Sequence, residues 1–242
     1  MIVIVGPTGS GKTGVGIRLA KKLEGEIISA DSRAIYKGMD IGTAKPTAKE
    51  QEGVVHHGLD LVEPGERFTV ADWKVYAEQK ICSIQKKGKT AIVVGGTGLY
   101  IDALVFDYKF TPEAKENYSD REKMRPEYVV FGIETEKEVL KERLRQRIEK
   151  MFSPELYEET RRLVEKYGWE NQAMKSDIYE YVYKYLEGEM SLEEAKEKAF
   201  FEDVHLAKRQ MTWFRRNKEI IWASLENIEE VVLKCIQDEQ TK

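Results

Sequence analysis

A glycine-rich run near the start of the chain has the residue types and the spacing of a phosphate-binding loop. It reads Gly6-Pro7-Thr8-Gly9-Ser10-Gly11-Lys12-Thr13 and fits the pattern GxxxxGK(S/T). In such a loop the backbone N–H groups surround phosphate oxygens, Lys12 supplies a cation, and the Thr13 hydroxyl is a ligand for Mg2+. The motif therefore predicts binding of a diphosphate or polyphosphate. By itself it leaves open whether that group is cleaved, transferred or expelled.

A carboxylate comes directly after the second apolar run, in Ala30-Asp31-Ser32-Arg33. Many P-loop ATPases instead hold Mg2+ with an acidic residue at the end of a later strand, but here the run 91–94 leads into Gly95-Gly96-Thr97-Gly98. At the carboxyl edge of an open α/β sheet, where ligands bind, Asp31 is placed to remove a proton from an acceptor. A helix or turn cap is the alternative interpretation of its position.

Two basic stretches lie further along the chain. Arg143 and Arg147 are four residues apart on one face of a predicted helix, so they form either a solvated face or a donor set for an anionic leaving group. Residues 204–218 contain no acidic residue and five basic ones, with Trp213 and Phe214 among them. This interleaving suits an RNA strand, because cations meet phosphates and aromatic rings stack on bases. A helix that packs one aromatic edge would show the same pattern.

Composition limits the class of protein. The 242 residues carry 39 Lys and Arg against 43 Asp and Glu, a net charge of −4, so any surface for nucleic acid must be local. No apolar run approaches the ~20 residues of a membrane span, and no basic region precedes an apolar one at the start, so we expect a cytoplasmic protein without membrane contact. We also expect it to be a monomer. Cys82 and Cys235 have neither a disulfide nor a zinc spacing. We interpret His56-His57 with Asp60 as packing or loop hydrogen bonding rather than as a metal pair.

Alternating strands and helices must position these residues. Short apolar runs, typical of strands covered on both faces, predict strands at 2–5, 27–30, 91–94 and 128–133. Helical spacing predicts helices from the phosphate loop to Gly25 and at 69–87, 136–151, 154–166, 191–216 and 228–237. The predicted fold class is α/β, a P-loop NTPase-like core with a mainly parallel sheet flanked by helices, plus a helical C-terminal part. Residues 1–106 and 128–242 would form it, with the charged segment 107–127 as a solvated connection.

Taken in order, these motifs resemble the tRNA dimethylallyltransferase family, also called tRNA isopentenyltransferases. Besides the phosphate loop, the resemblance rests on Ala30–Arg33 with Tyr36, Met39–Pro46, His56-His57 with Asp60 and Pro64, Gly95–Tyr100, the Arg143/Arg147 helix, and Ala207–Gln210 with Thr212-Trp213. It implies transfer of a dimethylallyl group from dimethylallyl diphosphate to N6 of an adenosine beside the tRNA anticodon, with Mg2+ as cofactor.

The resemblance also implies roles for single residues. Asp31 corresponds to the general base, Lys12 and Arg143 to catalytic contacts of the diphosphate, and Thr13 to the Mg2+ ligand. The diphosphate site would be completed by the other residues of the loop 6–13. The positions that correspond to tRNA-binding ones are Asp31, Ser32, Arg33, Ala34, Thr97, Lys208, Arg209, Gln210, Trp213 and Arg215.

The sequence departs from the family pattern mainly where tRNA would be held. Family members carry a long helical insertion that helps to grip the anticodon stem, and only the segment 107–127 occupies its place here. Ala34 stands where glutamine is common, Ile178-Tyr179 replaces a Gly-Tyr pair, and Val204 replaces an arginine. These departures keep an alternative open, in which a free adenine nucleotide (AMP, ADP or ATP) is the acceptor. More distant alternatives are a P-loop small-molecule kinase and a non-catalytic RNA-binding protein.

Overall fold

A parallel sheet forms the centre of the computed structural model, which describes residues 1–110, 123–175 and 178–240. Its strands are β1 (Ile2–Val5), β2 (Gly25–Ser29), β3 (His56–His57), β4 (Thr90–Gly95), β5 (Val129–Glu134) and β6 (Ile221–Ser224), in the order β3-β2-β4-β1-β5-β6. Each pair of neighbouring strands runs parallel, so their carboxyl ends meet at one edge. The predicted α/β core is confirmed.

The helices are α1 (Lys12–Lys22), α2 (Ala48–Gln51), α3 (Val70–Lys86), α4 (Gly98–Val105), α5 (Lys137–Met151), α6 (Pro154–Tyr167), α7 (Ile178–Leu186), α8 (Leu192–Phe214) and α9 (Ile228–Gln240). Sequence signals fix where the longest ones begin. Thr69 with Asp72 and Ser191 with Glu194 form capping boxes at the starts of α3 and α8, which satisfy backbone N–H groups that have no partner within the helix.

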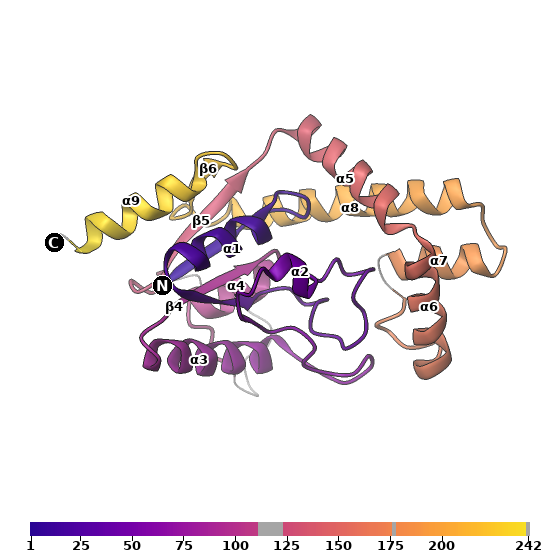
Figure 1. The fold of residues 1–242 in the computed structure, drawn as a ribbon, viewed down its shortest axis with the longest axis horizontal. Coiled ribbons are helices and arrows are strands. Elements are labelled where there is room, and N and C mark those ends of the chain that lie inside the picture. Colours follow the sequence, from indigo (N-terminus) through magenta and orange to yellow (C-terminus); the bar gives the residue numbers. More distant parts are fainter. Residues whose placement is uncertain (111–122, 176–177, 241–242) are drawn as a thin grey trace.

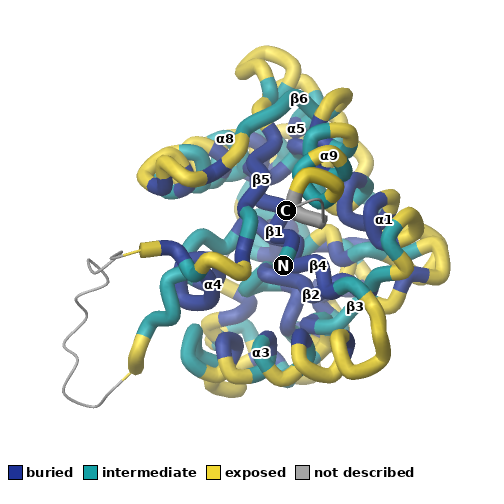
Figure 2. The backbone as a smooth tube through the Cα atoms, turned by 90° about the vertical axis from the view of Figure 1, so that its left-hand side faces the viewer, coloured by how far each residue is buried: buried dark blue, intermediate teal, exposed yellow. Residues whose placement is uncertain are grey.

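Helices cover both faces of the sheet (Figure 1). In β1, Val3 and Val5 pack in one core with α3, α4 and the end of α8, whereas Ile2 and Ile4 pack in the other core with α1 and α9. All four residues of β1 are buried, and Figure 2 shows β1, β2, β4 and β5 as the buried centre of the molecule. This two-sided cover explains the apolar runs of the central strands β1 and β4.

A third core lies among the helices α5, α6, α7 and α8, with Met39 packed into it. In Figure 1, α6 and α7 stand at the end of the molecule away from α9, and the long helix α8 runs from α7 back to the sheet. None of the helices in the described ranges is both long and apolar enough to span a membrane.

Five elements were not predicted, namely α2, β3, α4, α7 and β6. Helix α4 has six buried residues among its eight, so it lacks the polar face that helical periodicity needs. Strand β6 lies at the sheet edge and none of its four residues is buried, so it lacks the apolar run of a strand covered on both faces. The predicted connection at 107–127 lies mostly at 111–122, outside the described residues.

Candidate active site

The ends of three neighbouring strands bring the predicted site residues together. Strands β1, β4 and β2 are adjacent, and the loops that follow β2 and β4 are hydrogen-bonded to this edge. The N–H of Ala30 donates to the Val94 carbonyl at 2.8 Å, and the N–H of Thr97 donates to the Ala30 carbonyl at 3.1 Å. The phosphate loop, Asp31 and Thr97 therefore lie at one edge, where open α/β sheets bind ligands.

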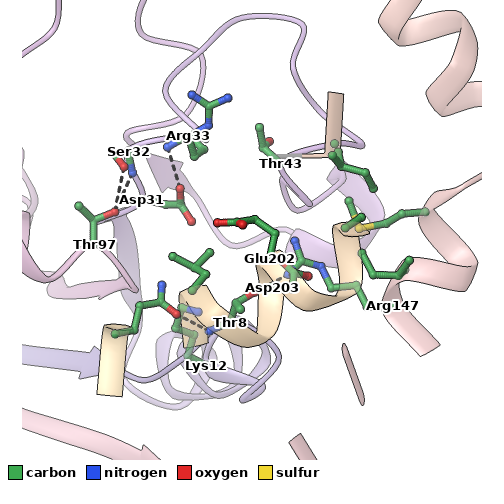
Figure 3. Close-up of a pocket in the computed structure, with 17 residues that line it drawn as sticks. Thr8, Lys12, Asp31, Ser32, Arg33, Thr43, Thr97, Arg147, Glu202 and Asp203 are labelled. Atoms are coloured by element: carbon green, nitrogen blue, oxygen red, sulfur yellow. Dashed lines mark hydrogen bonds and ion pairs between the residues drawn. The ribbon is translucent and has the colours of Figure 1, made fainter. Parts of the chain in front are cut away.

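A cavity of about 210 Å³ lies between this edge and the helices α5 and α8. Lys12 and Asp31 line it from the sheet edge, and Arg147, Glu202 and Asp203 line it from the helices. Figure 3 shows these side chains around one space. Aliphatic side chains complete the lining, among them Ile148, Met151, Ile178 and Leu206. The cavity thus combines cations, carboxylates and an apolar wall.

Lys12 is the cation of the phosphate loop itself. It opens α1, is half-buried, and donates from Nζ to the Pro7 carbonyl at 3.2 Å. Burial lowers the pKa of Lys12 to about 8; the charge of Asp31 opposes this shift and that of Arg147 adds to it. A bound diphosphate would favour the charged form of Lys12 again, because opposite charges stabilise each other.

Arg147 is a second cation at the same loop. Its guanidinium donates to the Thr8 hydroxyl and forms an ion pair with Asp203 of α8, with 3.3 Å between Nη1 and Oδ2. Arg143, one turn earlier on α5, lines a neighbouring cavity of about 440 Å³ together with Asp40. The structure therefore brings Arg147 into contact with the phosphate loop, and the diphosphate contact assigned to Arg143 stays a prediction.

The Asp31 carboxylate both caps a turn and lines the cavity. Its Oδ1 accepts hydrogen bonds from the backbone N–H groups of Arg33 at 2.8 Å and Ala34 at 3.3 Å, which is an Asx turn. The carboxylate is half-buried and faces the space that Lys12 also lines (Figure 3). The turn thus fixes the direction of the group, and the cap interpretation is compatible with a proton-accepting role.

The residues that follow Asp31 are held by their neighbours. The Thr97 hydroxyl accepts from the Ser32 N–H at 3.0 Å and donates to the Ser32 hydroxyl at 3.2 Å. Arg33 donates from Nη2 to the Ala173 carbonyl at 2.8 Å. Ser32, Arg33 and Thr97 line the main cavity, whereas Ala34 is buried and lines a smaller one of about 50 Å³.

Helix α8 turns one face towards the cavity, and the side chain of Gln210 on that helix contacts the phosphate loop. The Thr8 N–H donates to Gln210 Oε1 at 2.7 Å, and Gln210 Nε2 donates to the Gly96 carbonyl at 3.1 Å. Trp213 Nε1 donates to Asp102 Oδ2 at 2.9 Å. The Trp213 ring lies so close to Gly98 that a Cβ there would be 2.2 Å from it. The aromatic edge of the basic stretch therefore packs against α4.

The cations of the basic stretch lie on the outside of α8. Lys208, Arg209 and Arg215 are exposed. Arg209 pairs with Glu202 at 3.2 Å and Arg215 with Glu134 at 3.7 Å, which are surface ion pairs of small energetic weight. Arg209 and Arg215 can therefore exchange their present partners for phosphate groups.

The residues present fit Mg2+ bound in the manner of a phosphate loop. Thr13 and Asp31 line the smaller cavity together with Lys12, so the Thr13 residue that the motif assigns to Mg2+ lies beside a carboxylate and a cation. Within the described ranges, no group of three or more His, Cys, Asp or Glu side chains could hold a metal ion. Mg2+ is commonly held by one or two protein groups plus substrate phosphates, so a complete protein cage is not required.

The histidine pair serves the fold. His56 Nδ1 lies 2.9 Å from the Val54 carbonyl oxygen, and His57 Nε2 lies 2.7 Å from Glu26 Oε2. Both residues belong to strand β3. The interpretation of this pair as packing and hydrogen bonding is confirmed.

Sequence reasoning missed two acidic side chains of the cavity, Glu202 and Asp203. They precede Gln210 by about two helical turns, so the helical period places them near its face. That spacing was a usable signal, but the sequence alone does not say which face of α8 turns inward.

Comparisons with known protein families and structures point in one direction. A family model described as IPP transferase matches residues 34–128 and 113–217, and a model described as isopentenyl transferase matches residues 1–63. A tRNA dimethylallyltransferase of Pelotomaculum thermopropionicum is 36% identical over 286 residues, covering 94% of this chain and 91% of that protein. One of Bacillus subtilis is 34% identical, covering 92% and 90%.

Two solved structures agree with these relatives. A tRNA delta(2)-isopentenylpyrophosphate transferase of Staphylococcus epidermidis superposes with a TM-score of 0.84 at 32% identity, covering 99% of this chain and 98% of that one. A tRNA isopentenylpyrophosphate transferase of Bacillus halodurans gives 0.87 at 30% identity, covering 99% and 97%. The alignment over 286 residues is longer than this chain of 242, so the relative has residues without a counterpart here.

Proposed function

The chain belongs to the IPP transferase family, a family of prenyl-transferring enzymes, and from that premise we propose that it transfers a dimethylallyl group from dimethylallyl diphosphate to N6 of an adenosine beside the tRNA anticodon. One observation carries the proposal. The cations at the phosphate loop and the carboxylate of Asp31 line the same cavity, so a donor diphosphate and an acceptor nitrogen can meet there.

The cations of the cavity suit a departing diphosphate. As the bond from C1 of the allylic chain to the diphosphate oxygen breaks, its electron pair goes to that oxygen and positive charge develops on the carbon. Lys12 and Arg147 stabilise the charge on the oxygens, together with backbone N–H groups of the phosphate loop. We add Arg147 to this role because it contacts Thr8. Thr13 would hold Mg2+, which when bound would supply further positive charge to stabilise the leaving diphosphate.

The carboxylate suits the acceptor side of the reaction. The N6 nitrogen forms a bond to C1, and its proton becomes acidic as the bond forms. Asp31 accepts that proton as general base. Its Asx turn holds the carboxylate in one direction, so little reorganisation is needed at the moment of transfer.

Exposed cations on α8 support tRNA as the acceptor. Lys208, Arg209 and Arg215 are exposed on the helix whose other face lines the cavity, and contacts to several phosphates need a polymer. We propose that the enzyme acts on tRNA as a monomer in the cytoplasm. A free adenine nucleotide is the second candidate, because the relatives carry residues that this chain lacks.

The test compares acceptors directly. The protein is incubated with Mg2+ and dimethylallyl diphosphate, and separately with undermodified tRNA, AMP or ATP, and products are identified by mass spectrometry. We expect a prenylated adenosine in tRNA. Preferential prenylation of AMP or ATP at equal concentration would replace tRNA by the nucleotide, and no prenylated product with any acceptor would refute the proposal.

A further inference from the structure

We infer that Glu159, on α6, is a positioning residue that holds one wall of the active-site cavity; this inference rests on the function proposed above. Glu159 is a buried carboxylate with 6% of its surface exposed. Burying a charge is costly unless hydrogen bonds satisfy it, so the partners of this side chain indicate what it is there to hold.

The partners are three consecutive backbone N–H groups. Oε2 of Glu159 accepts from Asp40 at 3.2 Å and from Ile41 at 3.0 Å, and Oε1 accepts from Ile41 and Gly42, both at 3.1 Å. The Tyr179 hydroxyl donates to Oε1 at 2.6 Å. Burial, with the charge of Glu159, raises the pKa of Tyr179, so this donor keeps its proton. The loop thus closes around the carboxylate as an anion nest.

The loop that Glu159 holds, residues 40–45, borders three neighbouring cavities. Gly42 and Thr43 line the main cavity, and residues 43–45 line the smaller cavity beside Thr13. Residues 40, 41, 44 and 45 line the cavity of about 440 Å³ that Arg143 borders. Figure 3 shows Thr43 across the main cavity from Asp31. A shift of this loop would therefore change the space in which donor and acceptor meet.

The loop contains a strained residue and needs to be held. Ala44 has a φ of +51°, in the left-handed region that residues other than glycine seldom adopt. Such a conformation persists only where the surroundings enforce it. On one side Glu159 holds the loop, and on the other side Lys45 pairs with Asp40 and Asp60, both at 2.6 Å.

Close packing also sets the position of the loop. A Cβ at Gly42 would lie 2.3 Å from the ring of Tyr179, so the loop lies directly against α7. The diphosphate contacts proposed above, residues 6–13 and Arg147, are not hydrogen-bonded to Glu159. Loss of the carboxylate should therefore disturb the wall of the cavity and leave the phosphate loop in place.

The first test is Glu159→Gln, which puts an NH2 group where an oxygen accepted backbone N–H groups. We expect kcat with tRNA and dimethylallyl diphosphate to fall about 10- to 100-fold, the order expected for a small misplacement of reacting groups. The affinity for inorganic diphosphate, measured by calorimetry, should stay at the wild-type value. The matched control is Glu158→Gln. Glu158 precedes Glu159 on α6, and its side chain is exposed and pairs with Arg161.

The second test is rescue. Glycine adopts a positive φ without strain, so Ala44→Gly should restore part of the lost kcat in the Glu159→Gln background. Because kcat is measured per folded molecule, a loss of stability alone would not lower it, so its rescue at Ala44 reports the position of the loop. Should Glu159→Gln fail to fold, Tyr179→Phe removes one donor and keeps the three N–H groups, and we expect kcat to fall about two- to tenfold.

The outcomes separate this inference from the proposed function. A wild-type protein that prenylates no acceptor contradicts the function itself. If the wild type is active and the folded Glu159→Gln variant keeps its kcat and KM, only the role of Glu159 is overturned. The same conclusion follows if Glu159→Gln loses both kcat and diphosphate affinity and Ala44→Gly restores neither. If Tyr179→Phe is the variant used, an unaltered kcat overturns the positioning role of Glu159.

Discussion

Gln210 and Thr8 are joined by a hydrogen bond of 2.7 Å from the Thr8 backbone N–H to the Gln210 side-chain oxygen. The same side chain donates to the Gly96 carbonyl, so one residue of α8 links the phosphate loop to the loop after β4. The inner face of α8 therefore helps to build the proposed donor site, while its exposed face carries cations. Because the two faces are distinct, their contributions can be measured separately.

The exposed cations of α8 are tested by replacing Lys208, Arg209 and Arg215 with alanine. We expect weaker tRNA binding and a slope of log K against log salt reduced by about 2 to 3, since each lost phosphate contact removes about 0.7 to 0.9. Binding of dimethylallyl diphosphate should be unaltered. Titrations at several salt concentrations measure the slope. The control is Lys86→Ala on α3, which replaces an exposed lysine that does not line the cavity. If the triple variant keeps the wild-type slope, the exposed cations of α8 do not bind tRNA.

The two arginines of α5 are expected to differ. Arg147→Ala should weaken diphosphate binding about 10- to 100-fold, the range for losing a hydrogen bond to a charged group, because Arg147 contacts the phosphate loop. Arg143→Ala should have a smaller effect, since Arg143 lines the neighbouring cavity. Calorimetric titration of both variants with inorganic diphosphate ranks them. The reverse order would return the main contact to Arg143.

Donor binding should depend on pH through Lys12. Its pKa is lowered to about 8, so below that pH the ammonium is present for the diphosphate, and above it the free protein has lost the charge. Affinity should fall as the pH rises from about 7 to about 9, because binding must then take up a proton. Lys12→Arg keeps its charge over this range and serves as the control for ionisation of the donor itself. Equal pH dependence in both proteins would contradict the prediction.

Asp31→Asn separates the two roles of this side chain. The amide oxygen can still accept the N–H groups of Arg33 and Ala34 that now bond to Oδ1, so the turn and donor binding should persist. The proton acceptor is lost, and the chemical step should slow by about 10²- to 10⁴-fold. Single-turnover kinetics measure that step. A wild-type rate would leave Asp31 as a cap alone.

The stability of the fold at acid pH should depend on Glu26. This buried carboxylate contacts His57 at 2.7 Å and Lys89 at 2.9 Å, and the hydrogen bond with His57 is the main reason that its pKa falls to about 2. The folded pKa lies below the unfolded value of about 4.3, so the stabilisation is full above that value and is lost as the pH falls towards 2.

The corresponding variant is Glu26→Gln, with the exposed Glu24→Gln as control. We expect the free energy of unfolding to fall by about 3 kcal/mol at neutral pH, and the difference from wild type to shrink below about pH 4. Urea unfolding at several pH values gives both quantities. A difference that does not change with pH would show that Glu26 acts through packing and not through its charge.

The sequence by itself determined the features that are local in the chain. A phosphate loop is a contiguous strand, loop and helix, so residues 6–13 could be identified from their order alone. Asp31 could be placed at the same edge because parallel strands end together. The buried strands β1 and β4 could be read from their apolar runs, whereas α4, buried almost all round, gave no periodic signal.

Only the tertiary structure decided which side chains face one another. Arg143 and Arg147 share a helix face in sequence, and the packing of α5 decides that Arg147 contacts Thr8. Trp213 is equally suited to an RNA base and to a core. The fold places its ring against Gly98, and its contact with tRNA stays a prediction. Glu159 has no local motif, since its partners are backbone groups more than a hundred residues away. The physical reason is common to all three: residue spacing defines the face of a helix, but the direction of that face is fixed by the packing of distant elements.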